Sequence, residues 1–304
     1  MEDVRFDRMV PAQIRARREA CNLAYLPVGS LEWHGPHMPL GTDYLTVTHL
    51  AEEAAWRYGG VAFPPICYGD VRFYLQECRA EWRKTYAAEM GVPTEYPAAF
   101  GYYPGEEVEC PLPPDDGDPA AEGLPFSLQD QGRFFSLLIA KTILAVHLYG
   151  FRHILVMPGH GPNPAYCERA LEVYRENVGR RGAFGEPART RSWFYLEPAR
   201  EFEPLLNNHW IHADKWEGSI TMVAAPGTVH PEHLPRDPAR LVPAYLGHPY
   251  IHEDTGISPD YKHIRFSIEA LDPRNMDEEY GRAQVEAILG KLGEVIAEFM
   301  QAEE

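Results

Sequence analysis

The chain has 304 residues, of which 45% are hydrophobic and 24% charged, and a formal net charge of −17 at pH 7. This is the composition of a globular protein with a sizeable core, and the negative charge argues against nucleic acid or an anionic membrane as a partner. The five cysteines are scattered and form no CxxC pair, so neither a disulfide framework nor a zinc knuckle is expected. With no signal peptide and no apolar run of the ~20 residues that a membrane helix needs, we expect a cytoplasmic protein that acts on a small molecule.

Apolar residues are spaced in a way that predicts alternating strands and helices. The first half is expected to hold a helix within residues 1–20 that begins at Pro11, a strand at 23–28, a helix from Thr42 to about residue 59, with Thr42 or Asp43 as its cap, and a strand at 61–66. The second half is expected to hold a helix at 126–149 ended by Gly150, a strand at 154–157, a helix at 165–178, a strand at 191–196 and a closing helix at 277–300. This order predicts an α/β fold with three α/β/α layers around a mostly parallel central sheet.

Residues 68–125 do not follow this pattern. They are rich in proline, glycine, glutamate and aromatic residues and lack a sustained apolar stripe at helical spacing. A stretch of this length and kind is typical of an insertion, either at the rim of a pocket or as a structural excursion. We therefore expect one domain, residues 1–304, with an insertion at about 68–125.

The loop after the first strand carries the clearest chemical signal. Glu32, His34 and Asp43 lie within twelve positions, among glycines and prolines that keep the segment out of regular structure. Carboxylate and imidazole groups this close together favour a divalent metal ion. His160 follows the strand at 154–157, and polar loops at the carboxyl ends of parallel strands meet in space.

A third polar cluster contributes Glu217, which is expected to open a short helix and to reach the site from a later strand end. Two metal ions can then share these ligands. One ion would bind Glu32 and His160. The other would bind His34 and Glu217. Asp43 would bridge the two ions.

The chemistry expected of this site is hydrolysis. Two divalent ions lower the pKa of bound water to ~7, so a metal-bound hydroxide could attack a carbonyl carbon. His212, in the same cluster as Glu217, could then protonate the leaving nitrogen. His212 and Glu217 are therefore the predicted catalytic residues.

Other residues near these motifs have simpler interpretations. His37 is expected to form a hydrogen bond within its loop or to support a ligand from behind. Trp33, Trp210 and Trp216 are expected to pack rather than to contact substrate. Asp214 either orients His212 or is solvated.

Three motifs together resemble the creatininase (creatinine amidohydrolase) family. The first is Leu26-Pro-Val-Gly-Ser-Leu-Glu-Trp-His-Gly-Pro-His-Met-Pro-Leu-Gly-Thr-Asp43, which is long and specific. The second is Gly159-His160-Gly-Pro-Asn163, and the third is His212-Ala-Asp-Lys-Trp-Glu217-Gly-Ser219; both are degenerate. The resemblance implies a parallel α/β fold and a dinuclear site of zinc, or of manganese or iron. It also implies hydrolysis of a C–N bond in a cyclic amide or formamide, and a homo-oligomer, often a hexamer.

By position, the resemblance implies that Glu32, His34, Asp43 and His160 are ligands. The sequence departs from the family at Pro162, where creatininase has a glutamate, and Glu217 is our choice to replace that ligand. The Phe-Pro-Gly-Thr element that helps to shape the family's pocket is also absent, and residues 68–125 stand in its place.

Three functional interpretations follow. The first is a dinuclear amidohydrolase acting on a small polar metabolite. The second keeps the metal site but opens a keto-inositol ring by C–C hydrolysis, as some members of the family do. The third is a relative that has lost catalysis and serves only as a metal-binding or scaffold protein.

Overall fold

The computed structural model describes residues 3–32, 34–69, 128–181, 184–202, 212–234 and 272–301. The helices and strands of these residues are α1 (Pro11–Ala20), β1 (Leu23–Val28), α2 (Thr42–Tyr58), β2 (Val61–Ala62), α5 (Leu128–Leu148), β3 (His153–Pro158), α6 (Asn163–Arg181), β4 (Arg189–Ser192), α7 (Leu196–Phe202), α8 (Lys215–Ala224) and α9 (Glu278–Gln301). Short 3-10 turns are η1 (Phe6–Arg8), η5 (Pro231–His233) and η9 (Pro273–Asn275).

The strands form one parallel sheet in the order β2-β1-β3-β4. All six residues of β1 pair in register with β3, from Leu23 opposite His153 to Val28 opposite Pro158. Every residue of both strands is buried, which is why their sequences read as continuous apolar runs.

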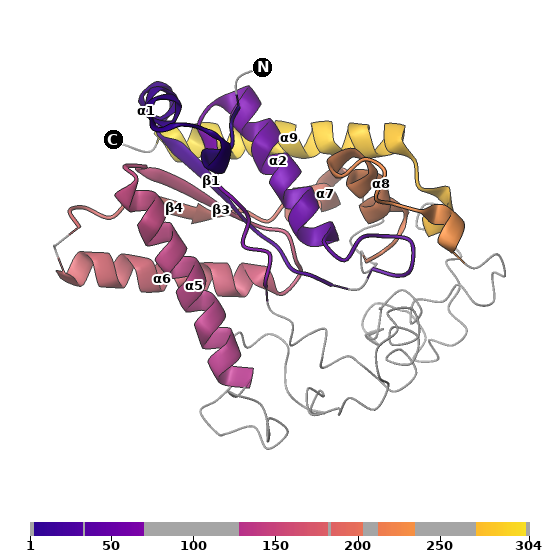
Figure 1. Cartoon of the computed structure of the whole chain (residues 1–304), viewed down its shortest axis with the longest axis horizontal. Helices are drawn as coiled ribbons and strands as arrows, with labels where there is room; N and C mark the ends of the chain where they lie inside the picture. Colours follow the sequence, from indigo (N-terminus) through magenta and orange to yellow (C-terminus); the bar gives the residue numbers. More distant parts are fainter. Residues whose placement is uncertain are drawn as a thin grey trace.

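Alternate residues of β1 belong to two different cores. Leu23 and Tyr25 pack with α2, α8 and α9, whereas Ala24 and Leu26 pack with α5 and α6. In Figure 1, α2, α8 and α9 accordingly lie on one side of the sheet and α5 and α6 on the other. The predicted three-layer α/β/α fold is confirmed.

The connections reverse direction between the two central strands. The chain leaves β1 through α2 towards β2 at one edge, and it leaves β3 through α6 towards β4 at the other edge. The loops after β1 and β3 therefore separate to opposite faces of the sheet, and the crevice between them is the usual ligand site of such folds.

Most predicted elements appear within one to three residues of their expected bounds, and three expectations were wrong in detail. The cap of α2 is the backbone of Gly41, while the Thr42 hydroxyl donates a hydrogen bond to the Pro39 carbonyl (2.7 Å). The second strand ends at Ala62, since Pro64 and Pro65 lack the N–H that a sheet needs.

The third difference is at β4, which lies at Arg189–Ser192 rather than at 191–196.

Gly150 does end α5, with a positive φ of 91°. Of the predicted insertion, only residues 68 and 69 lie within the described part of the chain. None of the helices that the structure describes is both long enough and apolar enough to span a membrane.

Candidate metal centre

The loop after β1 folds back on itself and fixes Glu32 and His34. The Glu32 N–H donates a hydrogen bond to the Leu40 carbonyl (2.8 Å), which closes the loop. The His34 ring donates from Nδ1 to the Glu32 carbonyl (3.2 Å), so Nε2 is the atom turned to the neighbouring carboxylates. Gly35 has a φ of 75°, a conformation that glycine adopts without strain.

Asp43 and His160 reach the same place from the next two segments. Asp43 lies in the first turn of α2, where the helix dipole favours a negative charge. The Gly159 N–H donates to the Val28 carbonyl (2.8 Å), and this bond seats His160 beside the end of β1. Asn163 ties the two loops together, because its amide donates to the Val28 and Gly29 carbonyls (3.1 and 3.2 Å).

A first group of three ligand atoms centres on His160. Its Nδ1 lies 3.1 Å from Glu32 Oε2 and 3.1 Å from Asp43 Oδ2. All three residues are buried.

A second group of three centres on His34. Its Nε2 lies 3.5 Å from Asp43 Oδ1 and 3.5 Å from Glu217 Oε1. The two oxygens of Asp43 thus face different histidines, and Asp43 belongs to both groups.

Glu217 lies in the first turn of the short helix α8, as the sequence predicted. The expectation that it reaches the site from a strand end was wrong. Its Oε2 accepts a hydrogen bond from the Ala213 N–H (2.6 Å), and Ala213 has a positive φ of 57°. Asp214 is the N-cap of α8 and accepts from the Glu217 N–H (3.0 Å). Asp214 is buried, so its predicted alternative as a solvated group is wrong.

His37 connects this turn to the first loop. Its Nε2 donates to the Ala213 carbonyl (3.2 Å), so it supports the glutamate side of the site rather than its own loop. Burial lowers the pKa of His37 to about 3, and the ring is therefore neutral.

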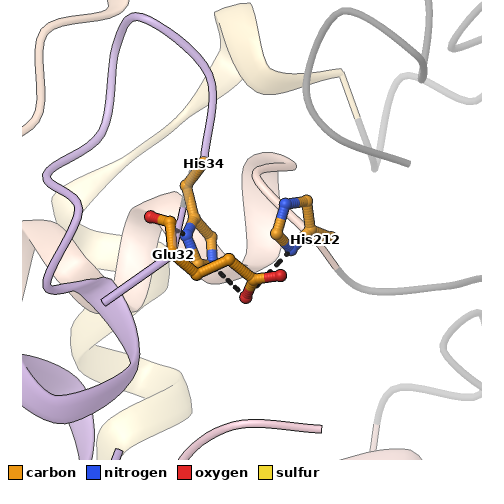
Figure 2. A group of neighbouring side chains, drawn as sticks. All are labelled: Glu32, His34 and His212. Atoms are coloured by element: carbon orange, nitrogen blue, oxygen red, sulfur yellow. Dashed lines mark hydrogen bonds and ion pairs between the residues drawn. The ribbon is translucent and has the colours of Figure 1, made fainter. Parts of the chain in front are cut away.

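His212 lies beside the cluster, as Figure 2 shows, and the Glu32 carboxylate lies next to both its ring and that of His34. Its Nδ1 lies 3.9 Å from Glu32 Oε2, and its ring centroid is 4.2 Å from that of His34. The side chain of His212 is 12% exposed, compared with 0% for His34. Glu32, His34 and His212 form a further possible ligand group, so His212 has the position of either a proton donor or a ligand.

The pKa of each group in the cluster depends on burial and on the charges of its neighbours. Burial alone would raise the pKa of Glu32, but the imidazoles of His160 and His212 lower it below its usual range. Burial opposes a proton on His34, yet the carboxylates of Glu217 and Asp43 raise its pKa to about 10. Burial likewise opposes a proton on His160, and Glu32 and Asp43 raise its pKa well above the usual value.

The residues present fit two divalent ions. His34 Nε2 and Asp43 Oδ2 are buried without a hydrogen bond, although each faces other ligand atoms. Ligands held tetrahedrally at ~2.1 Å from zinc lie ~3.4 Å apart, close to the 3.5 Å separations around His34. Within the described ranges, the ion pairs of Glu32, Asp43 and Glu217 are all with histidine, a side chain that can exchange its proton for a metal ion.

The structure therefore brings together all five predicted ligands and His212. Trp216 is fully buried and stacks on Tyr195, which agrees with its expected packing role. Trp33 and Trp210 lie outside the described residues. We did not predict from the sequence that Asn163 would join the two loops by hydrogen bonds. The one indication of a role was its place in the second motif.

Comparison with known proteins agrees with these motifs. The profile of the creatininase family, described as creatinine amidohydrolase, matches residues 7–76 and 118–296. A solved structure described as "Creatininase Mn" is similar over 98% of this chain and 98% of that chain, with a TM-score of 0.60 and 16% identity. A putative creatinine amidohydrolase from Bacteroides fragilis gives a TM-score of 0.56 and 16% identity over 100% of this chain and 99% of that chain. Identities this low support the fold alone.

One curated relative is more similar, but locally. The 3-dehydro-scyllo-inosose hydrolase of Thermotoga maritima is 46% identical over 66 residues. That match covers 22% of this chain and 21% of the relative, so it spans about a fifth of either protein.

Proposed function

The chain belongs to the creatininase family, and we propose that it is a metal-dependent hydrolase that opens a ring of a small polar metabolite at a carbonyl carbon. One observation carries the proposal. Two buried ligand groups, one around His160 and one around His34, share the carboxylate of Asp43. A shared carboxylate is what two divalent ions need if they are to act on one substrate.

The ligand assignment follows the two groups. Glu32 and His160 would hold one ion, His34 and Glu217 the other, and Asp43 both. Zinc is the first choice for these nitrogen and oxygen ligands, and manganese or iron would also suit them. When bound, such ions supply Lewis acidity, which activates water and polarises a carbonyl group.

The chain's own residues prepare the site for that chemistry. The hydrogen bond from His34 Nδ1 to the Glu32 carbonyl fixes the tautomer that presents Nε2 as a ligand. Burial of Glu32, Asp43 and Glu217 excludes bulk water and strengthens their hold on a cation. His212, the more exposed neighbour, is assigned to proton transfer, with Nε2 delivering the proton to the atom that leaves the carbonyl carbon.

We favour a C–C bond in an oxidised inositol ring as the bond that is cleaved. The support is the local 46% identity to a protein named as a hydrolase of 3-dehydro-scyllo-inosose. In such a ring, water oxygen bonds to a carbonyl carbon and the adjacent C–C bond breaks. The electron pair is taken up as an enolate by a second ketone and then receives a proton, so the product is a ring-opened carboxylic acid.

A C–N bond is the second candidate, as expected from the motifs. The family profile is that of creatinine amidohydrolase, and it matches most of the chain. In this reaction the electron pair leaves on nitrogen, and His212 would protonate the departing amine. The same residues serve both reactions, so only the substrate distinguishes them.

A substrate screen on metal-loaded protein tests the proposal. We would incubate the full chain with a diketo-inositol, creatinine, other cyclic amides and formamides, and follow each by mass spectrometry. The expected result is a gain of one water by the diketo ring. Turnover of an amide alone would replace the favoured substrate with the second candidate.

Metal content provides the second arm of the test. We expect two ions per chain after loading with zinc or manganese. Fewer than one ion per chain, together with no turnover of any compound, would refute both hydrolase candidates and favour a binding protein.

A further inference from the structure

A second cluster of metal-binding side chains lies on the surface, outside the metal centre. His230, Glu232 and His233 are contributed by η5 and the residue before it, and all three are exposed. One ligand atom from each lies within 4.8 Å of the other two. The cluster shares no residue with the five ligands proposed above.

The side chains of this cluster lie against one another, through one ion pair and one pair of stacked rings. His230 Nδ1 lies 3.0 Å from Glu232 Oε1. The rings of His230 and His233 are nearly parallel, with an interplanar angle of 20° and centroids 5.1 Å apart. Two imidazoles and a carboxylate are a donor set that suits zinc, with water completing the coordination.

A hydrogen bond fixes His233 in the form that binds metal. Its Nδ1 lies 3.3 Å from the Pro36 carbonyl, which can only accept, so Nδ1 carries the proton. Nε2 of His233 therefore presents a lone pair. A backbone carbonyl behind the ring is the usual support of a metal-ligating histidine.

The cluster is also attached to the loop of the metal centre. The backbone N–H of His230 donates to the His37 carbonyl (2.7 Å), and His233 bonds the neighbouring Pro36. The ring of His37 in turn holds the Ala213 carbonyl beside Glu217. An ion that fixed His230 and His233 would thus fix residues 36 and 37.

We propose that His230, Glu232 and His233 bind one further divalent ion of the zinc class, and that this ion clamps η5 to the loop at residues 36 and 37. The site does not depend on the proposed hydrolysis. With three protein ligands in solvent, it binds more weakly than the buried centre and fills after it.

Equilibrium dialysis against zinc, with the buried centre already saturated, tests this site. We expect wild-type protein to bind one more zinc per chain than His230→Ala or His233→Ala, and Glu232→Gln to bind that zinc at least tenfold more weakly. His49→Ala, which removes a half-buried imidazole on α2, is the matched control and should keep the additional zinc.

Thermal unfolding gives an independent reading of the clamp. Zinc added beyond saturation of the buried centre should raise the melting temperature of wild type and of His49→Ala, but not of the two cluster histidine variants. Wild-type protein that takes up no additional zinc would overturn the proposal. So would an additional zinc that persists in both histidine variants.

Discussion

Asp43 is the residue on which both ligand groups depend, since each of its oxygens faces a different histidine. In Asp43→Asn the side chain keeps its size but loses its charge. Both ions should then bind more weakly, and activity should fall by more than the ~10–100-fold that supporting residues cost. Metal analysis after dialysis and steady-state kinetics would measure this. Asp7→Asn, at an exposed carboxylate paired with Arg5, is the matched control and should change neither quantity.

His212 has two possible roles, and one substitution separates them. If it transfers a proton, His212→Gln should lower kcat by ~10²–10⁴-fold, the usual contribution of a general acid, and leave two ions bound. That is the result we expect, because its side chain is the more exposed one and its Nδ1 is 3.9 Å from Glu32. If the variant instead retained a single ion, His212 would be a ligand.

His37 acts at a distance from the reacting atoms, through its hydrogen bond to the Ala213 carbonyl. His37→Phe keeps a ring but cannot donate, so the turn that presents Glu217 should loosen. We expect ~10–100-fold weaker metal binding, confined to one of the two ions. A chelator titration followed by metal analysis would show one ion leaving first. His37→Asn, which can still donate, should recover part of the affinity; equal loss of both ions would contradict this role.

At the scale of elements, the loop that carries His160 packs against α2 through a close approach that only glycine allows. A Cβ on Gly159 would lie 2.5 Å from the Asp43 carbonyl and 2.7 Å from a methyl of Val47. Gly159→Ala should push the loop of His160 away from α2 and destabilise the fold by ~1–3 kcal/mol. Urea unfolding and metal affinity should both report the change.

Gly161 provides the control in the same loop. A Cβ there would meet no atom within 4 Å, and its φ is not positive. Gly161→Ala should therefore leave stability within about 0.5 kcal/mol and metal binding unchanged. If the two variants behaved alike, contact with α2 would not be what positions His160.

Elements were predictable from the sequence where burial is complete. β1 was predicted at its observed bounds because both of its faces are covered, which leaves an unbroken apolar run ended by glycine. β4 was misplaced because its buried and half-buried residues alternate weakly and include two arginines. The cap of α2 was misassigned because the Thr42 hydroxyl bonds the carbonyl of Pro39 instead of a helix N–H. That bond depends on the path of the loop before the helix, which local residue preferences do not reveal.

At the scale of the whole molecule, the site joins segments that are distant in the chain. Glu32, Asp43 and His160 could be grouped from the sequence, since the carboxyl ends of neighbouring parallel strands lie at the same edge of the sheet. Glu217 was named through its motif, but its route was not predictable, because it depends on how α8 packs against α2 and α9. The same holds for the bond between His37 and Ala213, which are 176 positions apart.

This arrangement makes the metal centre a stabiliser of the whole fold. The ligands come from the loop after β1, from α2, from the loop after β3 and from α8, so ions bound to the native state should raise its melting temperature. Treatment with EDTA should lower it. Readdition of zinc should restore it in wild type, but much less in Asp43→Asn.

The rise in melting temperature that metal binding causes should depend on pH. Without metal, burial disfavours a proton on His34, but the Glu217 and Asp43 carboxylates outweigh it and raise its pKa from 6.5 to about 10. The stability contributed by this proton is complete below about pH 6.5 and is lost as pH rises towards 10. Metal binding displaces the same proton, so it is favoured as pH rises. The difference in melting temperature between zinc-loaded and EDTA-treated protein should therefore widen from pH 6.5 to pH 9. Scanning calorimetry at fixed free zinc would measure it, and a constant or narrowing difference would mean that His34 is not displaced from its proton by the metal.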